Sequence, residues 1–200
     1  EGALALLILL DQFPRNVFRG SGEAFASDAH ARAIARKVVL EKRFDLKLGP
    51  YEKPFLYLPF EHSEAPADQD LSVALFEGLR DVAHHARANG AIDYAWRHRV
   101  VIQDFGRFPH RNAALGRVSS PAEQAWLDAG RLLMAAAKIA ILGAGLAGDR
   151  ETLPSGGGRL GLGADDLHLV AVLEFGDERR VAAVHLRTHA GIAHGGVHRI

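Results

Sequence analysis

The sequence contains no cysteine among its 200 residues. This absence excludes disulfide bonds, thiolate nucleophiles and cysteine-ligated metal sites, and it suits a reducing compartment without requiring one. An excess of charge of one sign is also missing, since 24 Lys and Arg residues balance 24 Asp and Glu residues. Without a net positive field, the composition disfavours nucleic acid and anionic membranes as partners. We therefore expect a cytoplasmic protein.

A hydrophobic run long enough to cross a membrane is absent as well. The apolar run at the start of the chain, Ala3 to Leu10, falls far short of the roughly twenty residues that a transmembrane helix needs. No basic segment precedes this run, so it does not have the pattern of a signal peptide. The chain begins without methionine, at Glu1 and Gly2, and we expect a helical domain that is truncated at its N-terminus.

What the sequence does contain is an apolar run that ends abruptly in a polar cluster. The first apolar run has no polar face, so a helix there must be surrounded by protein. Asp11 and Arg15 follow it four residues apart, the spacing at which a carboxylate and a guanidinium meet on one helix face. Asn16 and Arg19 lie directly after them. A similar block, FGRFPHRN, recurs at residues 105–112.

Hydrophobic periodicity predicts helices in the following part of the chain. One surface helix is predicted to begin at an N-cap of Ser27 or Asp28 and to run to about Phe44, with apolar residues at three- and four-residue spacing. Another is predicted from Asp68, as its N-cap, to a C-cap at Asn89-Gly90. Four prolines lie between these two segments or at their edges, so we expect short helical turns there in place of a long regular helix.

Two more helices are predicted before residue 137. One spans residues 92–103 and places His98 on its apolar side, where a hydrogen-bonded core histidine is the expected role. The other begins at Ser120, which forms a capping-box sequence with Glu123. No alternating strand pattern occurs in this part of the chain, so the predicted fold class is all-α.

The character of the sequence changes after residue 132. KIAIL at residues 138–142 reads as a strand, and two apolar segments flank Gly176-Asp177-Glu178 as a possible β-hairpin. We predict a helical domain over residues 1–132, followed by an appended glycine- and histidine-rich segment over residues 133–200. For this segment, a folded and a poorly ordered form both remain open.

Gly143, Gly145 and Gly148 have the spacing of a dinucleotide-binding fingerprint. The stretch resembles the opening of flavin- or nicotinamide-binding oxidoreductases. Such a fingerprint also needs a helix that begins inside the glycines, so that its N-terminus meets the pyrophosphate. Pro154 and further glycines follow within a few residues and disfavour that helix. We therefore predict no cofactor and keep an oxidoreductase fragment as the weaker alternative.

Several blocks between residues 3 and 128 resemble the bacterial family catalogued as domain of unknown function 924 (DUF 924). In order they are LLILLDQFPRN, RGSGEAFASD, PFLYLPFEHSE, ADQDLSVALFE and FGRFPHRNAALGRVSSPAE. The resemblance implies an all-helical, tetratricopeptide-like bundle, although this chain shows no internal repeat of that kind. It implies no activity, because none is settled for the family.

Polar residues from three of these blocks are predicted to converge at helix ends. Arginines there could hold a carboxylate or a phosphate bidentately, with Glu61, Glu64 or His110 acting as acid or base. The predicted ligand-binding residues are Asp11, Arg15, Asn16, Arg19, His62, Arg107, Arg111 and Asn112.

Three interpretations of this cluster remain open. The leading one is a helical domain that binds a small anionic molecule or a peptide. The second is a hydrolase that uses one of Glu61, Glu64 and His110 as its general base. The third is purely structural, because ion pairs between arginines and carboxylates also join helix ends.

A metal site built from His62, His110 and either Glu61 or Glu64 is chemically conceivable, since imidazole and carboxylate groups bind zinc or iron. The spacing of these residues matches no established metal-binding motif. We therefore predict no metal.

Overall fold

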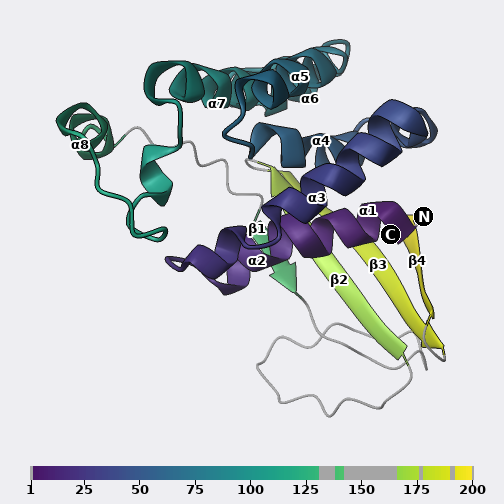
Figure 1. Ribbon diagram of the computed structural model, residues 1–200. Coiled ribbons are helices and arrows are strands. Elements are labelled where there is room, and N and C mark those ends of the chain that lie inside the picture. Colours follow the sequence, from purple (N-terminus) through teal and green to yellow (C-terminus); the bar gives the residue numbers. More distant parts are fainter. Residues whose placement is uncertain (1, 131–137, 142–165, 176–177, 190–191, 200) are drawn as a thin grey trace. The chain divides into compact units, whose positions relative to one another are not determined.

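The computed structural model describes residues 2–130, 138–141, 166–175, 178–189 and 192–199. The chain divides into two compact units, of which one comprises Leu6–Ala136 and the other comprises Glu1–Ala5 with Ala137–Ile200. The described residues of the first unit are helices and connecting loops (Figure 1), so the predicted all-α fold of this region is confirmed. Its likeness to tetratricopeptide repeats stays a prediction.

Short helices follow one another closely along the described part of the chain. The α-helices are α1 (Gly2–Leu7), α2 (Phe13–Val17), α3 (Asp28–Ala35), α4 (Lys53–Glu61), α5 (Pro66–Glu77), α6 (Ala83–Ala86), α7 (Ala91–Phe105) and α8 (Pro121–Asp128). Between them lie the π-helical segments η1 (Ile8–Gln12) and η3 (Arg36–Glu41) and the 3₁₀ segments η2 (Gly22–Phe25), η4 (Phe44–Lys47) and η5 (Pro109–Arg111).

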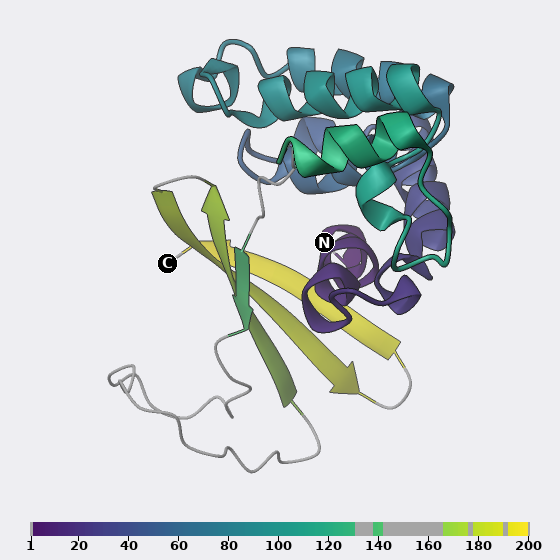
Figure 2. The same ribbon diagram turned by 90° about the vertical axis from the view of Figure 1, so that its left-hand side faces the viewer.

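The core of the helical unit is built around α4. This helix contacts η1, α3, α5 and α7, and Figure 1 shows it between α3 and α5. Its Leu56 and Phe60 are fully buried, and its Tyr57 packs edge-on against Phe76 of α5 with 5.6 Å between the ring centroids. Helices α5 and α7 lie side by side in Figures 1 and 2. Burial of α4 on several sides fixes the position of the residues at its C-terminal end.

The prediction of short turns in the proline-rich segment underestimates α4, which is nine residues long and contains Pro59. Proline removes one backbone hydrogen bond from a helix interior. Phe55, Leu56 and Phe60 nevertheless all reach the core from this helix, and their burial offsets the loss.

The predicted helix from Asp68 to Gly90 is wrong in its bounds. Helix α5 begins at Pro66 and ends at Glu77, and the shorter α6 follows it. Asp68 does not cap α5, because its carboxylate accepts a hydrogen bond of 2.7 Å from Ser63 and pairs with Arg36. Tertiary ion pairs thus replace the local capping role that the sequence suggested.

Helices α3, α7 and α8 lie where the sequence predicts helices. Helix α3 continues into η3, so the regular α-helix is shorter than predicted. At the start of α8, Ser120 Oγ accepts a hydrogen bond from the Glu123 backbone N–H, and the Glu123 carboxylate accepts one from the Ser120 backbone N–H. The predicted capping box is confirmed.

The described strands of the second unit form an antiparallel sheet in the order β1 (Lys138–Ile141), β2 (Asp166–Phe175), β3 (Glu178–His189) and β4 (Ile192–Arg199). Strands β2 and β3 pair from Phe175 opposite Glu178, which places them around the predicted hairpin position. Gly143, Gly145 and Gly148 lie outside the described residues. The boundary between residues 132 and 133 stays a prediction. Among the described residues, no helix has the length and apolar character needed to cross a membrane.

We expect Ser120→Ala to lower the free energy of unfolding by about 1 kcal/mol, because one N-terminal N–H of α8 loses its acceptor. The measurement is chemical unfolding followed by circular dichroism. Gln124→Ala, on the exposed face of the same helix, is the matched control and should change stability by less than about 0.5 kcal/mol. Equal effects of both variants would show that the capping box does not stabilise α8.

Candidate functional site

The site begins with a buried carboxylate directly after the apolar run. Asp11 lies in η1 and is 1% exposed. Its carboxylate accepts hydrogen bonds from His62 Nδ1 at 2.8 Å and from Gln12 Nε2 at 2.5 Å, and it lies 3.3 Å from the Arg15 guanidinium. Burial alone would raise the pKa of Asp11, but Arg15 and His62 outweigh it and hold that pKa below its ordinary value. Asp11 is therefore ionised.

A second carboxylate lies between two arginines. Both oxygens of Asp28, the first residue of α3, lie 2.8 Å from terminal nitrogens of Arg15. Arg111 approaches the same carboxylate at 3.3 Å and donates a hydrogen bond of 2.9 Å to the backbone carbonyl of His62. Segments far apart in the sequence therefore meet through Asp28.

Arg111 is held between two aromatic rings. Its guanidinium carbon lies 4.7 Å from the ring centroid of Phe25 and 4.5 Å from that of Phe108. Burial and the neighbouring Arg15 lower the pKa of Arg111 to about 10, which still leaves it charged. Its Nε atom is buried and has no hydrogen-bond partner in the described part of the chain. The side chain is thus fixed in place with one donor unused.

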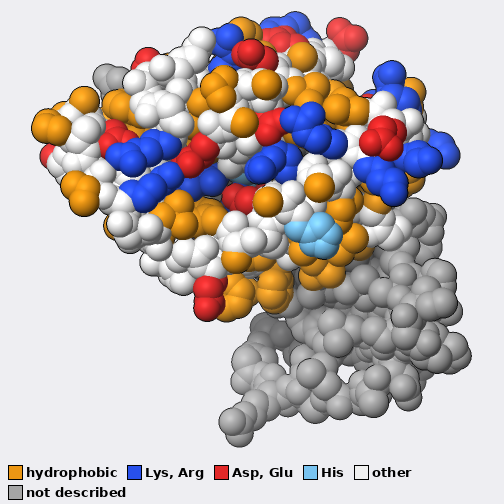
Figure 3. Space-filling view, in the orientation of Figure 1, with side chains coloured by type: hydrophobic (Ala, Val, Ile, Leu, Met, Phe, Trp, Pro, Cys, Tyr) orange, Lys and Arg blue, Asp and Glu red, His pale blue; other side chains and the backbone are white. Residues whose placement is uncertain are grey.

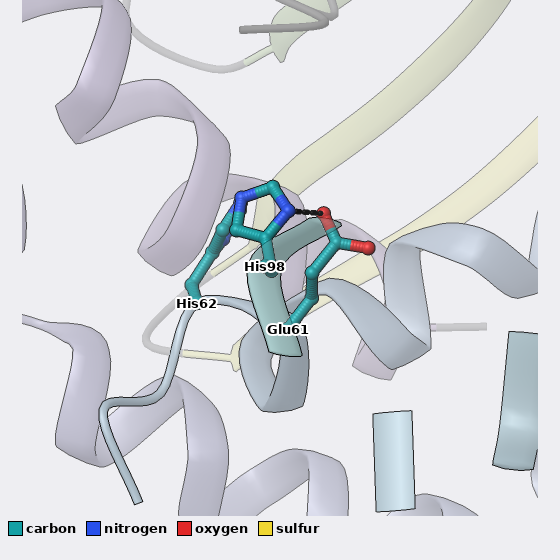
Figure 4. Close-up of side chains that lie close together, drawn as sticks. All are labelled: Glu61, His62 and His98. Atoms are coloured by element: carbon teal, nitrogen blue, oxygen red, sulfur yellow. Dashed lines mark ion pairs between the residues drawn. The ribbon is translucent and has the colours of Figure 1, made fainter. Parts of the chain in front are cut away.

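A carboxylate and two imidazoles gather where α4 ends beside α7 (Figure 4). His98 Nδ1 lies 3.4 Å from Glu61 and donates a hydrogen bond of 2.8 Å to the Tyr94 carbonyl. Burial, aided by the negative charge of Asp11, raises the pKa of Glu61 to about 8. Burial lowers the pKa of both His62 and His98. The predicted burial and hydrogen bonding of His98 are confirmed.

Glu64 is fully engaged by other groups. Its two oxygens accept hydrogen bonds of 2.8 and 3.0 Å from Arg117, and one of them also accepts the backbone N–H of Phe108 at 2.8 Å. These bonds outweigh partial burial and lower the pKa of Glu64. The ion pair between Glu64 and Arg117 therefore joins the end of α4 to the loop after α7.

Two predicted ligand residues face α8 and its preceding loop. Arg107 donates hydrogen bonds of 2.6 and 2.7 Å to Glu123 and one of 2.9 Å to the Val118 carbonyl. Asn112 Nδ2 donates to Ser119 Oγ at 3.1 Å. Both side chains thus support the start of α8.

The remaining predicted residues lie at the edge of the site. Asn16 donates a hydrogen bond of 2.9 Å to the Gln12 carbonyl, and Arg19 donates one of 3.1 Å to Asn16 at the exposed surface. His110 is the second residue of η5. Burial of its ring and the nearby positive charge of Arg111 lower the pKa of His110 to about 4. Its ring is therefore neutral at pH 7.

The structure brings part of the predicted site together in one hydrogen-bonded network. The members of this network, which we call the Asp11–Arg111 network, are Asp11, Arg15, Asp28, His62 and Arg111. Sequence reasoning missed Asp28 and the ring contacts of Phe25, both of which lie in the RGSGEAFASD block. It also missed Arg117, which lies five residues after Asn112 in the last of the blocks.

The surface of the helical unit repeats this mixture of charges. On the face shown in Figure 3, Lys and Arg side chains alternate with Asp and Glu side chains along a band across the helices. Opposite charges in one band neutralise each other at long range. Selection of a charged ligand therefore depends on individual side chains and not on a broad field.

Comparisons with known proteins give a family and a solved structure. The family model described as "Bacterial protein of unknown function (DUF924)" matches residues 1–131. A solved structure of a protein of unknown function from Agrobacterium tumefaciens is 38% identical, with a TM-score of 0.57, and the match covers 64% of this chain and 68% of that one. No curated protein matches the chain.

We expect Glu123→Gln to destabilise the protein at neutral pH and to lose this effect in acid. The hydrogen bond from Arg107 is the main cause that lowers the pKa of Glu123 in the folded state. A lowered pKa contributes stability above the pKa of the unfolded chain, and this contribution disappears as the pH falls. Urea unfolding between pH 7 and pH 3 measures the difference. For Arg107→Gln as well, the difference in free energy of unfolding from the wild type should shrink as the pH falls. A difference that stays constant with pH would contradict this assignment.

Proposed function

Since the chain belongs to the DUF924 family of bacterial proteins, whose description names no function, we propose one from the site itself. The helical unit binds a small anionic ligand, or the carboxylate of a peptide, between Arg15 and Arg111. One observation carries this proposal: two guanidiniums, that of the buried Arg111 and that of the partly buried Arg15, converge on a single carboxylate, that of Asp28. A guanidinium binds a carboxylate or a phosphate through a planar fork of donors, so the same position suits either group of a ligand.

The unused donor of Arg111 supports a ligand at this place. A buried N–H without an acceptor costs about 1–3 kcal/mol. Arg111 Nε is such a donor among the described residues, and its side chain cannot turn away because Phe25 and Phe108 enclose it. An oxygen atom of a bound anion would satisfy Nε. Because this hydrogen bond to Nε exists only when the anion is bound, it favours binding.

Charge balance indicates how the anion enters. Asp11 and Asp28 neutralise Arg15 and Arg111, so an added anion requires one carboxylate to move away. The Asp11 side chain is 2% exposed and is fixed by His62, whereas that of Asp28 is 14% exposed and belongs to the first residue of a helix. Asp28 is therefore the internal competitor that a ligand displaces.

We expect Asp28→Asn to bind inorganic phosphate or succinate about tenfold more tightly than the wild type, because about 1.4 kcal/mol of competition is removed. Arg111→Lys should weaken binding by at least about tenfold, since lysine cannot reproduce the fork of donors. Isothermal titration calorimetry measures both dissociation constants, and circular dichroism verifies the fold. Asp93→Asn, which removes an exposed partner of Arg97, is the matched control and should bind as the wild type does.

The opposite pattern would support the purely structural interpretation. In that case, Asp28→Asn and Arg111→Lys would both lower the melting temperature strongly, and neither phosphate nor succinate would bind to any of the proteins. Arg111→Ala adds a further measure, since it removes the guanidinium from both rings. A folded Arg111→Ala protein that still binds the anions as tightly as the wild type would overturn the proposed function.

A hydrolase is the second candidate, with Arg15 and Arg111 as clamps for the substrate's charge. Of the three possible general bases, Glu64 is occupied by Arg117, whereas the His110 ring is neutral and its Nδ1 has no described hydrogen-bond partner. His110 is therefore favoured over Glu64 as the general base. Release of p-nitrophenol from its acetate and phosphate esters tests this candidate. Loss of about a hundredfold in rate for His110→Ala would support it, and an absence of turnover by the wild type would exclude it for these esters.

A further inference from the structure

Glu61, His62 and His98 come together from α4 and α7 in the interior of the helical unit. Each offers one potential ligand atom, and these atoms all lie within 4.8 Å of one another. Figure 4 shows the His98 ring between the other two side chains, with its ion pair to Glu61. We propose that these three residues bind a divalent transition-metal ion. The site goes beyond the proposed anion binding and does not depend on it.

Both imidazoles form a hydrogen bond through Nδ1 to an oxygen acceptor. His62 Nδ1 bonds to the carboxylate of Asp11, and His98 Nδ1 bonds to the carbonyl of Tyr94. Carboxylate and carbonyl oxygens only accept, so each Nδ1 carries the proton and each neutral ring keeps its lone pair at Nε2. In His98 the nitrogen that lies 3.4 Å from Glu61 is this same Nδ1, so a metal ion shared with Glu61 through Nε2 requires a shift of the His98 ring. A histidine that binds metal through one nitrogen commonly donates its other N–H to such an oxygen.

Unlike the buried carboxylates of Asp11 and Glu123, that of Glu61 forms no ion pair with an arginine among the described residues. Asp11 pairs with Arg15, and Glu123 pairs with Arg107. Glu61 is 4% exposed, and among the described residues its ion-pair contact is with the His98 ring, which is charged only when protonated. A bound metal ion would stabilise the ionised form of this buried carboxyl group.

The donor set selects the class of ion. Two imidazoles and one carboxylate suit Zn²⁺ and Fe²⁺, whereas Mg²⁺ and Ca²⁺ prefer oxygen ligands alone. Three protein ligands also leave a coordination position for water or another ligand. Sequence reasoning had considered His110 in place of His98, because His110 lies in the same kind of motif block as His62. In the structure, α7 places His98, and not His110, beside Glu61 and His62.

The test uses the full chain, stripped of metal with a chelator and titrated with Zn²⁺ by calorimetry and with Co²⁺ by visible absorption. We expect one Zn²⁺ ion to bind per chain and to raise the melting temperature. We also expect Co²⁺ to show visible absorption bands typical of a low coordination number. Glu61→Gln and His98→Gln should each lose this binding, and Asp11→Asn, as a positioning variant, should weaken it about 10- to 100-fold. Mg²⁺ should not compete.

Glu61→Gln separates a metal site from a structural role. Because Gln keeps the shape of the side chain and cannot ionise, this variant should be at least as stable as the metal-free wild type while it loses Zn²⁺ binding. His30→Gln, at an exposed position, is the matched control and should bind as the wild type does. The histidines between residues 168 and 198 are present in every variant, so any binding there is common to all. Equal Zn²⁺ affinity and Co²⁺ spectra of the wild type and folded Glu61→Gln would overturn the proposal.

Discussion

The burial of the Asp11 charge is the constraint on which the rest of the site depends. An apolar run leads directly to this residue, so its carboxylate enters the interior and must find partners there. Arg15 and His62 provide them, and Arg15 in turn needs the carboxylate of Asp28. Arg111 then bonds to Asp28 and to the backbone of His62. One buried charge therefore fixes four segments of the chain relative to one another.

The same constraint relates the two proposed binding sites. Asp11 holds His62 by Nδ1 and thereby leaves its Nε2 unprotonated, and the His62 side chain lies beside Glu61 and His98. On its other side, Asp11 shares Arg15 with Asp28, where the proposed anion site lies. An anion between the arginines and a cation between the imidazoles would both act on the Asp11–Arg111 network. The two proposed ligands, of opposite charge, would then lie on either side of the hydrogen-bonded pair Asp11 and His62.

Local features of the site could be predicted from the sequence, and long-range partners could not. The Asp11–Arg15 contact and the Ser120–Glu123 capping box follow from fixed helical spacings. Asp28 reads locally as a helix start, yet its carboxylate is used by Arg15 and by Arg111, which is 83 residues away. Asp68 similarly reads as a cap but pairs with Arg36. Arg107 lies in the same FGRFPHRN block as Arg111, but its guanidinium bonds to Glu123. Which partner each of these side chains pairs with depends on how the helices pack, and the spacing of residues in the sequence does not determine that packing.

The protonation state of the His62 ring tests the account most directly, because it reports the bond from Asp11 to the centre of the site. Long-range ¹H–¹⁵N NMR spectra of ¹⁵N-histidine-labelled, metal-free protein at pH 7 distinguish the two neutral tautomers and the charged ring. Assignment uses His62→Gln. The account predicts that the neutral ring carries its proton on Nδ1 and leaves Nε2 unprotonated. A proton on Nε2 with Nδ1 bare would contradict it.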